Sequence, residues 1–341
     1  MKKKLLLTIA LLFIIVYMSG CAYIIKSTTK LQVVTTLYAE YSIVTEILNA
    51  SEETKNLCDV TMIIKPGQDS HTYDPSIEDL IKIKNADIFI YTSNEMETWV
   101  SDIDFSSDTK VVNLEENENI ELLVVEDSAE EEDNHDHSHD HSHEHTHAHS
   151  HDPHYWLYPV YTTYMVNDIK EALKSKIKDP LGTKQIALEN SAQHYIDALN
   201  RIDRDLQIVS NNAKQKTMYF GSPFTFYYWA HFYNLEYKLI YSTCSTETEP
   251  SLDVLEHMIL DMKAKDIKYI FAKELVNQQA CKMISYHTNA EVLVLHSGHN
   301  VSALEFNSPS MSYLNIMKQN VINLAKMLNV DQSVIDTLGK E

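Results

Sequence analysis

The run LQVVTTLYAEYSIVTEIL, residues 31–48, decides the fold. Its first part, Leu31 to Thr36, is apolar and rich in β-branched residues, as is typical of a buried strand. Helical spacing follows at once, with apolar side chains at Tyr41, Val44, Ile47 and Leu48. The stretch therefore predicts one strand followed by one helix.

The same unit repeats along the chain. In the first half, further strands are expected at 60–64, 86–91 and 110–114, with helices at 77–83 and 96–103. In the second half, strands are expected at 217–220, 237–241, 267–272 and 292–295, with helices beginning near Phe224, Ser251 and Leu275 and a last one over 313–328. Apolar strands that alternate with helices indicate parallel sheets covered on both faces. We predict an α/β protein with two similar lobes, each a four-stranded, mainly parallel sheet with flanking helices.

A long amphipathic helix separates the two halves. Its apolar residues recur at spacings of three and four: Leu188, Ala192, Tyr195, Leu199, Ile202, Leu206 and Val209. We interpret it as a rigid connector between the lobes, the alternative being a coiled-coil dimerisation helix. The predicted parts are an N-terminal lobe over 31–160 with an acidic and His-rich loop at 115–151, a connecting helical segment over 161–213, and a C-terminal lobe over 214–341.

The N-terminus carries an export signal. Lys2, Lys3 and Lys4 precede an apolar run from Leu5 to Met18, which suits a signal peptide over 1–20 better than a membrane span of about 20 residues. The run ends in Met18-Ser19-Gly20-Cys21, which resembles a bacterial lipobox in which Cys21 is lipidated. We expect an extracytoplasmic protein, anchored to the bacterial cell membrane through Cys21 and a tether over 21–30. The alternative is an uncleaved anchor helix.

Composition limits the partners. The 341 residues include 28 Lys and Arg against 49 Asp and Glu, a formal net charge of -21. Such a chain lacks the clustered cations that nucleic acids require, so no nucleic-acid partner is expected. We expect a monomer. Apart from Cys21, the cysteines are Cys58, Cys244 and Cys281, without CxxC spacing, which leaves a Cys244–Cys281 disulfide open.

Histidine points to metal. The chain has 17 His, and an acidic stretch over 115–133 leads into an alternating tract. The tract contains His135, His137, His139, His141, His143, His145, His147, His149 and His151. Neutral imidazoles bind zinc, copper and nickel, and nearby carboxylates concentrate cations. We predict an auxiliary metal-binding loop, the alternative being a solvated segment without function.

Four other histidines follow strands or open packed structure. His71 lies in DSHTYDPS (69–76), His154 in DPHYWLYP (152–159), and His296 and His299 in HSGH after the last strand of the second half. The carboxyl ends of parallel strands are where ligands bind. Three or four imidazoles suit a tetrahedral Zn²⁺ site, whereas Mn²⁺ would bring more oxygen ligands. His231 is a reserve candidate; His194, His257 and His287 are expected at the surface.

Together these features resemble the zinc-binding solute receptors of metal ABC importers. The resemblance rests on the lipobox, DSHTYDPS, the His-rich loop, DPHYWLYP and the long connecting helix, and covers nearly the whole mature chain. It implies His71 and His154 as zinc ligands. The family commonly adds a His at the turn that opens the second lobe, where this chain reads Phe220-Gly221-Ser222-Pro223-Phe224, and an acid after the last strand. The chain thus resembles a branch whose second-lobe ligands come from His296 and His299.

The resemblance implies a receptor that captures Zn²⁺ between its lobes and delivers it to a membrane permease driven by an ATPase. The alternatives are a zinc-holding surface adhesin and an extracellular metallohydrolase. Outside the alternating His tract, where residues 143–147 read HEHTH, the sequence contains no H-E-x-x-H motif, and it contains no G-x-S-x-G, Walker A or G-x-G-x-x-G motif, so we expect no enzyme. Zinc affinity is expected to fall as the pH drops below about 6.5, the ordinary pKa of histidine.

Overall fold

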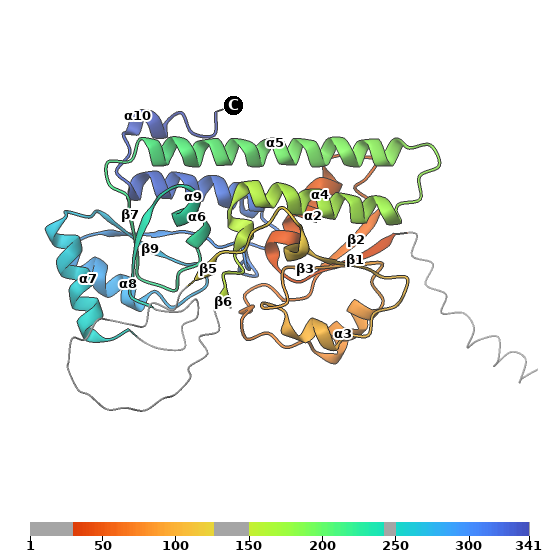
Figure 1. Cartoon of the computed structure of the whole chain (residues 1–341), viewed down its shortest axis with the longest axis horizontal. Helices are drawn as coiled ribbons and strands as arrows, with labels where there is room; N and C mark the ends of the chain where they lie inside the picture. Colours follow the sequence, from red (N-terminus) through yellow and green to blue (C-terminus); the bar gives the residue numbers. More distant parts are fainter. Residues whose placement is uncertain (1–29, 126–149, 242–249, 341) are drawn as a thin grey trace, which may run out of the picture.

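The computed structural model describes residues 30–125, 150–241 and 250–340. Two four-stranded sheets form the centres of two lobes that lie side by side (Figure 1). The first sheet contains β1 (Leu31–Thr35), β2 (Cys58–Met62), β3 (Ile88–Tyr91) and β4 (Lys110–Asn113). The second contains β7 (Thr217–Phe220), β8 (Glu236–Leu239), β9 (Tyr269–Ala272) and β10 (Glu291–Val294). All pairings within these two sheets are parallel, which confirms the predicted α/β class and the two similar lobes.

Both sheets share one topology. The spatial orders are β2-β1-β3-β4 and β8-β7-β9-β10, so in each lobe the first strand in sequence lies between the second and the third. Strands β3 and β7 are buried at every position, as their apolar sequences require. In sheets of this order, ligands bind outside the carboxyl ends of the strands, and these ends carry the histidine-containing loops of both lobes.

Helices cover the sheets. In the first lobe they are α2 (Tyr38–Asn49), α3 (Ile77–Lys84), α4 (Pro159–Lys176) and the short 3₁₀ segments η1 (Thr98–Asp102), η2 (Leu114–Glu116) and η3 (Tyr155–Leu157). In the second they are α6 (Tyr227–Phe232), α7 (Leu252–Ala264), α8 (Gln279–Thr288), η4 (Pro309–Met311), α9 (Tyr313–Met327) and α10 (Gln332–Ile335). Ser76 and Ser251 cap α3 and α7 by accepting backbone N–H groups. A small antiparallel pair, β5 (Val124–Val125) and β6 (Ser150–His151), flanks residues 126–149.

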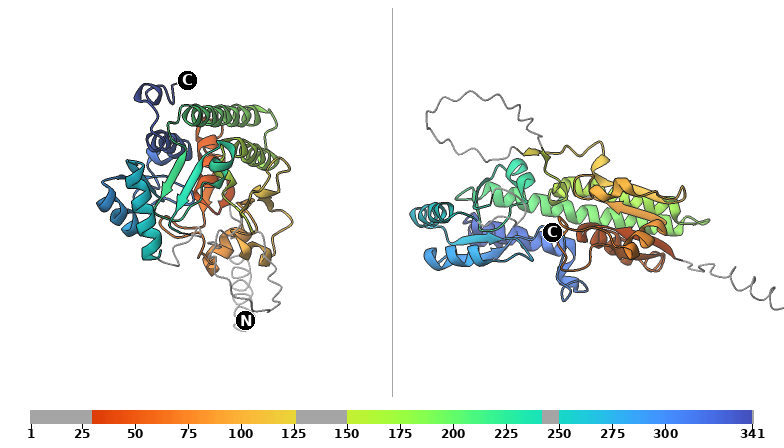
Figure 2. Two further views of the ribbon diagram at one scale, coloured as in Figure 1. Left: turned by 60° about the vertical axis from the view of Figure 1, so that its left-hand side comes forward. Right: turned by 90° about the horizontal axis from the view of Figure 1, so that it is seen from below.

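One helix spans both lobes. Helix α5 (Thr183–Asn211) packs against α4 and α2 of the first lobe and α9 of the second, and Figures 1 and 2 show it running along the molecule. The long connector predicted from sequence is therefore confirmed as a helix, but the segment over 161–213 holds two helices. The chain reverses between α4 and α5 at Gly182, whose φ of 72° is in the left-handed region that glycine adopts without strain.

The apolar core is continuous between the lobes. One cluster of buried side chains includes Ile88 of the first sheet, Leu199 of α5 and Phe220 of the second sheet. Trp156 and Trp229, both completely buried, belong to the same cluster. Moving the lobes apart as rigid bodies would expose part of this shared core to water, which opposes a large opening motion.

The helix expected at 96–103 is wrong in type and length. The structure has only the five-residue 3₁₀ segment η1, because Val100 alone is buried there and offers too small an apolar face for a longer helix. In addition, the Glu97 carboxylate turns back to accept the backbone N–H of Thr92 (3.3 Å) and Ser93 (3.0 Å).

Several predicted features lie outside the described residues: the signal peptide, Cys21, most of the tether, the tract from His135 to His149, and Cys244. Cys58 and Cys281 are buried free thiols, and the Cys281 thiol donates to the Gly221 carbonyl oxygen (3.0 Å). Within the three described ranges, no helix combines the length and apolar character that crossing a membrane requires.

The spanning helix provides a test of the shared core. Leu199 of α5 is completely buried, whereas Ile208 of the same helix is 39% exposed. Leu199→Ala is expected to lower the free energy of unfolding by about 3 kcal/mol through lost burial and a residual cavity, and Ile208→Ala by less than about 1 kcal/mol. Urea denaturation of both variants measures the difference. Equal effects would contradict the role of α5 as a buried bridge.

Candidate metal centre

His71 lies in the loop between β2 and α3. The loop is shaped by its own polar groups, since the Asp69 carboxylate accepts the backbone N–H of His71 (3.0 Å). It is also bonded to the second lobe. Gly67 donates its N–H to the Val301 carbonyl (2.8 Å), and the Asn300 amide donates to the carbonyls of Lys65 (2.8 Å) and Gln68 (2.9 Å). The second lobe therefore holds the loop that carries His71.

His154 is fixed by the residues around it. The Asp152 carboxylate accepts both the backbone N–H (2.8 Å) and the ring Nδ1–H (3.0 Å) of His154. Helix α6 of the second lobe clamps the segment, because the Tyr228 hydroxyl donates to the Asp152 carbonyl (2.8 Å) and the Trp229 indole to the Leu157 carbonyl (2.6 Å). His154 is 1% exposed, so its position is set by packing as well as by these bonds.

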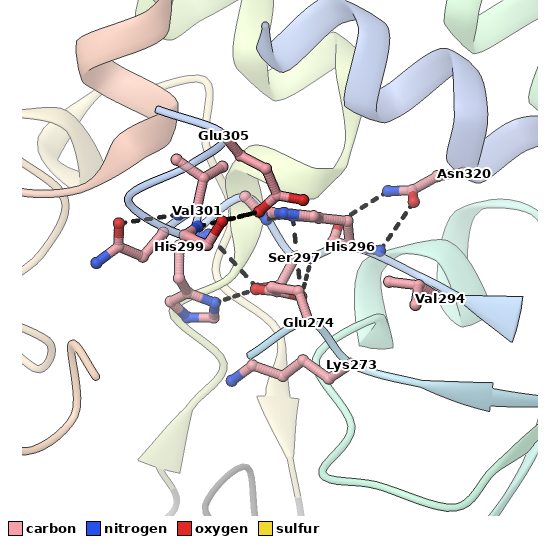
Figure 3. Close-up of polar contacts among 12 residues, drawn as sticks. Lys273, Glu274, Val294, His296, Ser297, His299, Val301, Glu305 and Asn320 are labelled. Atoms are coloured by element: carbon pink, nitrogen blue, oxygen red, sulfur yellow. Dashed lines mark hydrogen bonds and ion pairs between the residues drawn. The ribbon is translucent and has the colours of Figure 1, made fainter. Parts of the chain in front are cut away.

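His299 comes from the loop after β10 and is oriented by a relay. Its Nδ1 contacts the Ser297 hydroxyl, and that hydroxyl contacts the Glu274 carboxylate (Figure 3). Glu274 also accepts the Ser297 backbone N–H (2.8 Å). The loop turns at Gly298, whose φ of 75° favours glycine. The relay passes from a buried carboxylate through a hydroxyl to the imidazole.

The three rings converge. One ligand nitrogen from each of His71, His154 and His299 lies within 4.8 Å of the other two. The Nε2 atoms of all three rings are buried and have no hydrogen-bond partner. Buried polar atoms without a partner are rare in folded proteins, and three on neighbouring histidines form a candidate cation site. A tetrahedral zinc ion with bonds of about 2.1 Å needs ligand nitrogens about 3.4 Å apart, a spacing compatible with three nitrogens that lie within 4.8 Å of one another.

The neighbouring groups also set the protonation of the rings. A carboxylate can only accept, so in the neutral His154 ring Nδ1 carries the proton and Nε2 has the lone pair. The Ser297 hydroxyl donates to Glu274 and can therefore accept from Nδ1 of His299, which leaves its Nε2 free as well. Burial would raise the pKa of Glu274, but the charges of His296 and Lys273 and hydrogen bonds from Ser297 hold it below its ordinary value. Glu274 is thus ionised at neutral pH.

Burial keeps two of the rings neutral. It lowers the pKa of His71 to about 4, aided by the nearby charges of Lys273 and His154. Burial, followed by the charge of Lys273, also lowers the pKa of His299 well below its ordinary value. Both rings therefore offer lone pairs to a metal at pH values well below about 6.5, the ordinary pKa of histidine. The sequence had predicted that zinc affinity falls below that pH.

His296 does not join the three rings. Its Nδ1 accepts the Gly298 backbone N–H (3.0 Å) and lies 3.8 Å from a Glu274 oxygen, so it supports the turn that presents His299. His231, His194, His257 and His287 are exposed, as expected for the last three. Of the predicted auxiliary ligands, only His151 lies within the described residues. Its ring Nδ1 is 3.9 Å from a Glu95 carboxylate oxygen. In the sequence His151 directly precedes Asp152, the residue that orients His154.

Sequence reasoning missed the residues that orient the rings. Asp152 stood in the quoted DPHYWLYP box, two residues before His154, a spacing from which a carboxylate can bind the ring of a following histidine. Ser297 likewise precedes His299 by two residues. No pattern in the sequence pointed to Glu274 and Lys273 as neighbours of His299. They follow β9, more than 20 residues before His299, and only the fold places them near its loop.

The family described as zinc-uptake complex component A periplasmic (ZnuA) matches residues 33–327. The chain belongs to this family. The ZnuA of Bacillus subtilis, named as a high-affinity zinc uptake system protein, is 30% identical over 302 residues, which are 88% of each chain.

Two further relatives extend the comparison. The zinc-binding protein AdcA of Streptococcus pyogenes is 29% identical over 345 aligned residues, which cover 100% of this chain and 63% of AdcA. The chain thus spans less than two thirds of that relative. The Zn(II)-bound ZnuA-like domain of Streptococcus pneumoniae AdcA shares the fold, with a TM-score of 0.67 at 24% identity over 88% of this chain and 99% of that domain.

The relay to His299 predicts a measurable loss. Ser297→Ala removes the hydroxyl that orients Nδ1, and loss of such a partner typically lowers metal affinity 10- to 100-fold. We expect a fall of that size in Zn²⁺ affinity, measured by competition with a chromophoric chelator. Ser302→Ala is the control, because the Ser302 hydroxyl also bonds a carboxylate, that of Glu305 (2.6 Å), outside the three-histidine cluster. A wild-type affinity in Ser297→Ala would contradict the relay.

The lowered pKa of His71 predicts how the metal-free protein responds to acid. Between pH 6.5 and about 4, an unfolded chain protonates this histidine but the folded protein does not, so the free energy of unfolding must fall as the pH falls through this window. In His71→Asn, the slope of the free energy of unfolding against pH should correspond to up to one fewer proton taken up on unfolding. Chemical denaturation without metal, from pH 7 to pH 4, measures this slope. His257→Asn at the surface should retain the wild-type slope; an equal slope in both variants would refute the assignment.

Proposed function

We propose that this protein is an extracytoplasmic receptor that captures Zn²⁺ between its two lobes and delivers it to an ABC permease for import. The observation that carries the proposal is the set of three buried, unpartnered Nε2 atoms on His71, His154 and His299. Zn²⁺ is the cargo, and these rings are its proposed ligands. Membership of the ZnuA family and the names of the relatives support the same metal.

The donor set favours zinc. Three imidazoles and one open position make a tetrahedral site of the kind zinc adopts with protein ligands. Manganese prefers oxygen ligands, and the nearest carboxylates are engaged elsewhere: Asp152 with the ring of His154, and Glu274 with Ser297. We assign His296 the role of supporting the Gly298 turn instead of coordinating the ion.

Binding without turnover follows from the same contacts. A zinc hydrolase needs a general base within hydrogen-bond reach of the metal-bound water. Asp152 and Glu274 each hold a ring or its hydroxyl partner in place and would have to release it to act as a base. We therefore infer that the protein is no enzyme.

The remaining parts suit a tethered receptor. The signal peptide over 1–20 and Cys21 would leave a lipid-anchored monomer with its tether at 21–30, next to a permease and its ATPase. The proposed units are the first lobe at 31–160, the connecting segment at 161–213 and the second lobe at 214–341. The His-rich loop ends at His151, three residues before His154, so we propose that it passes captured zinc to the three-histidine site.

The decisive experiment compares two changes in the mature protein. Replacing both His71 and His154 by Ala removes two of three ligands, and we expect Zn²⁺ affinity to fall more than about 100-fold because even partners of ligands are worth 10- to 100-fold. Deleting residues 135–151 would remove the whole of β6 (Ser150–His151), so the deletion is confined to 135–149 and is expected to leave the tight site intact. Competitive titration and metal analysis measure both.

Controls and physiology complete the test. His194→Ala with His257→Ala changes two exposed histidines and should leave affinity unchanged. In cells, only variants with the tight site should support growth on limiting zinc, which separates an importer's receptor from a zinc-holding adhesin. If the 135–149 deletion abolished tight binding while the His71 and His154 double replacement kept it, the proposed site would be refuted.

A further inference from the structure

Lys273 is a buried cation beside the three histidines. It directly follows β9, is 8% exposed, and its backbone N–H donates to the Ser222 hydroxyl (2.7 Å). In Figure 3 its side chain extends on the side of the His299 ring, with the ammonium at the end nearer that ring. Its charge also contributes to the lowered pKa of both His71 and His299, in agreement with this position.

In the described part of the chain the ammonium forms no close ion pair, although it acts on the Glu274 carboxylate at longer range. No carboxylate in residues 30–125, 150–241 or 250–340 forms an ion pair with Lys273. The nearest in sequence, Glu274, is bonded to Ser297, and Asp152 to His154. A buried charge is costly unless it is paired, so a cation in this position calls for an anion.

Binding of zinc would place a dication near this ammonium, while the carboxylates of Asp152 and Glu274 remain bonded to His154 and Ser297. Three neutral imidazoles contribute no charge, so a dication at the site would lie close to a second, buried positive group. The three rings also leave the fourth tetrahedral position open. A ligand at that position that is negative and reaches the ammonium would satisfy the metal and Lys273 together.

We propose that Lys273 and the bound zinc ion together hold a small carboxylate or bicarbonate as the fourth ligand. One oxygen of the planar anion coordinates the metal, and the other accepts a hydrogen bond from the Lys273 ammonium. The proposal rests on the zinc site described above. The cargo would then be a zinc ion together with its bound anion, and Lys273 would be the residue that selects for zinc carrying such an anion.

Zinc titration in the presence of defined anions tests the proposal. In buffer free of carboxylate and carbon dioxide, adding formate or, separately, bicarbonate should raise the Zn²⁺ affinity of the mature protein at least 10-fold, after correction for zinc bound by the anion in solution. Lys273→Met should lose this gain. Lys268→Met is the control, because Lys268 follows α7 on the surface, paired with Asp266, and should retain the full gain.

A charge-conserving variant guards against a folding defect. Lys273→Arg keeps a cation that binds planar anions and should keep the anion dependence, with circular dichroism as the check on folding. Three results would overturn the proposal: a wild-type Zn²⁺ affinity that neither anion changes, an increase in affinity in Lys273→Met equal to that of the wild type, or an equal increase caused by chloride. Absence of tight zinc binding under every condition would instead refute the proposed function.

Discussion

The structure depends on the hydrogen bonds that fasten the loop after β10 to the first lobe. Tyr38 at the start of α2 donates to the His299 carbonyl (2.9 Å), the Trp156 indole donates to the Ser297 carbonyl (2.8 Å), and Asn300 holds the loop of His71. These donors come from three separate segments of the chain. Because the loop is bonded at Ser297, His299 and Asn300, the position of His299 relative to His71 and His154 is fixed by the fold, which limits the ordering entropy lost on binding.

The charged groups around the three histidines have fixed positions relative to the rings. The carboxylates of Asp152 and Glu274 lie behind the rings, bonded to Nδ1 directly or through Ser297, and the Nε2 atoms face inward. Burial holds His71 and His299 neutral. Negative charge placed one bond behind a neutral ligand increases its basicity without filling a coordination position. The arrangement strengthens imidazole donors while leaving the metal accessible to a further small ligand.

Much of this could be predicted from the sequence because the signals are local. A buried parallel strand is apolar along its whole length, as in β3 and β7, and His71 and His154 stand in the short sequence boxes DSHTYDPS and DPHYWLYP. His299 could not be separated from His296, since both follow β10 and only the left-handed turn at Gly298 decides which ring faces inward. Lys273 and Glu274 could not be found at all, because their roles arise from contacts between β9 and a loop far along the chain.

The shared core has a kinetic consequence. Since buried side chains of both lobes pack into one cluster around α5, the ion cannot leave by a wide separation of the halves. Of the three rings, only that of His71 is partly open to solvent, whereas His154 and His299 are enclosed. We therefore expect an ion held by the three rings to leave past the short loop over 65–71, at a rate set by how readily that loop moves while the rest of the molecule stays still.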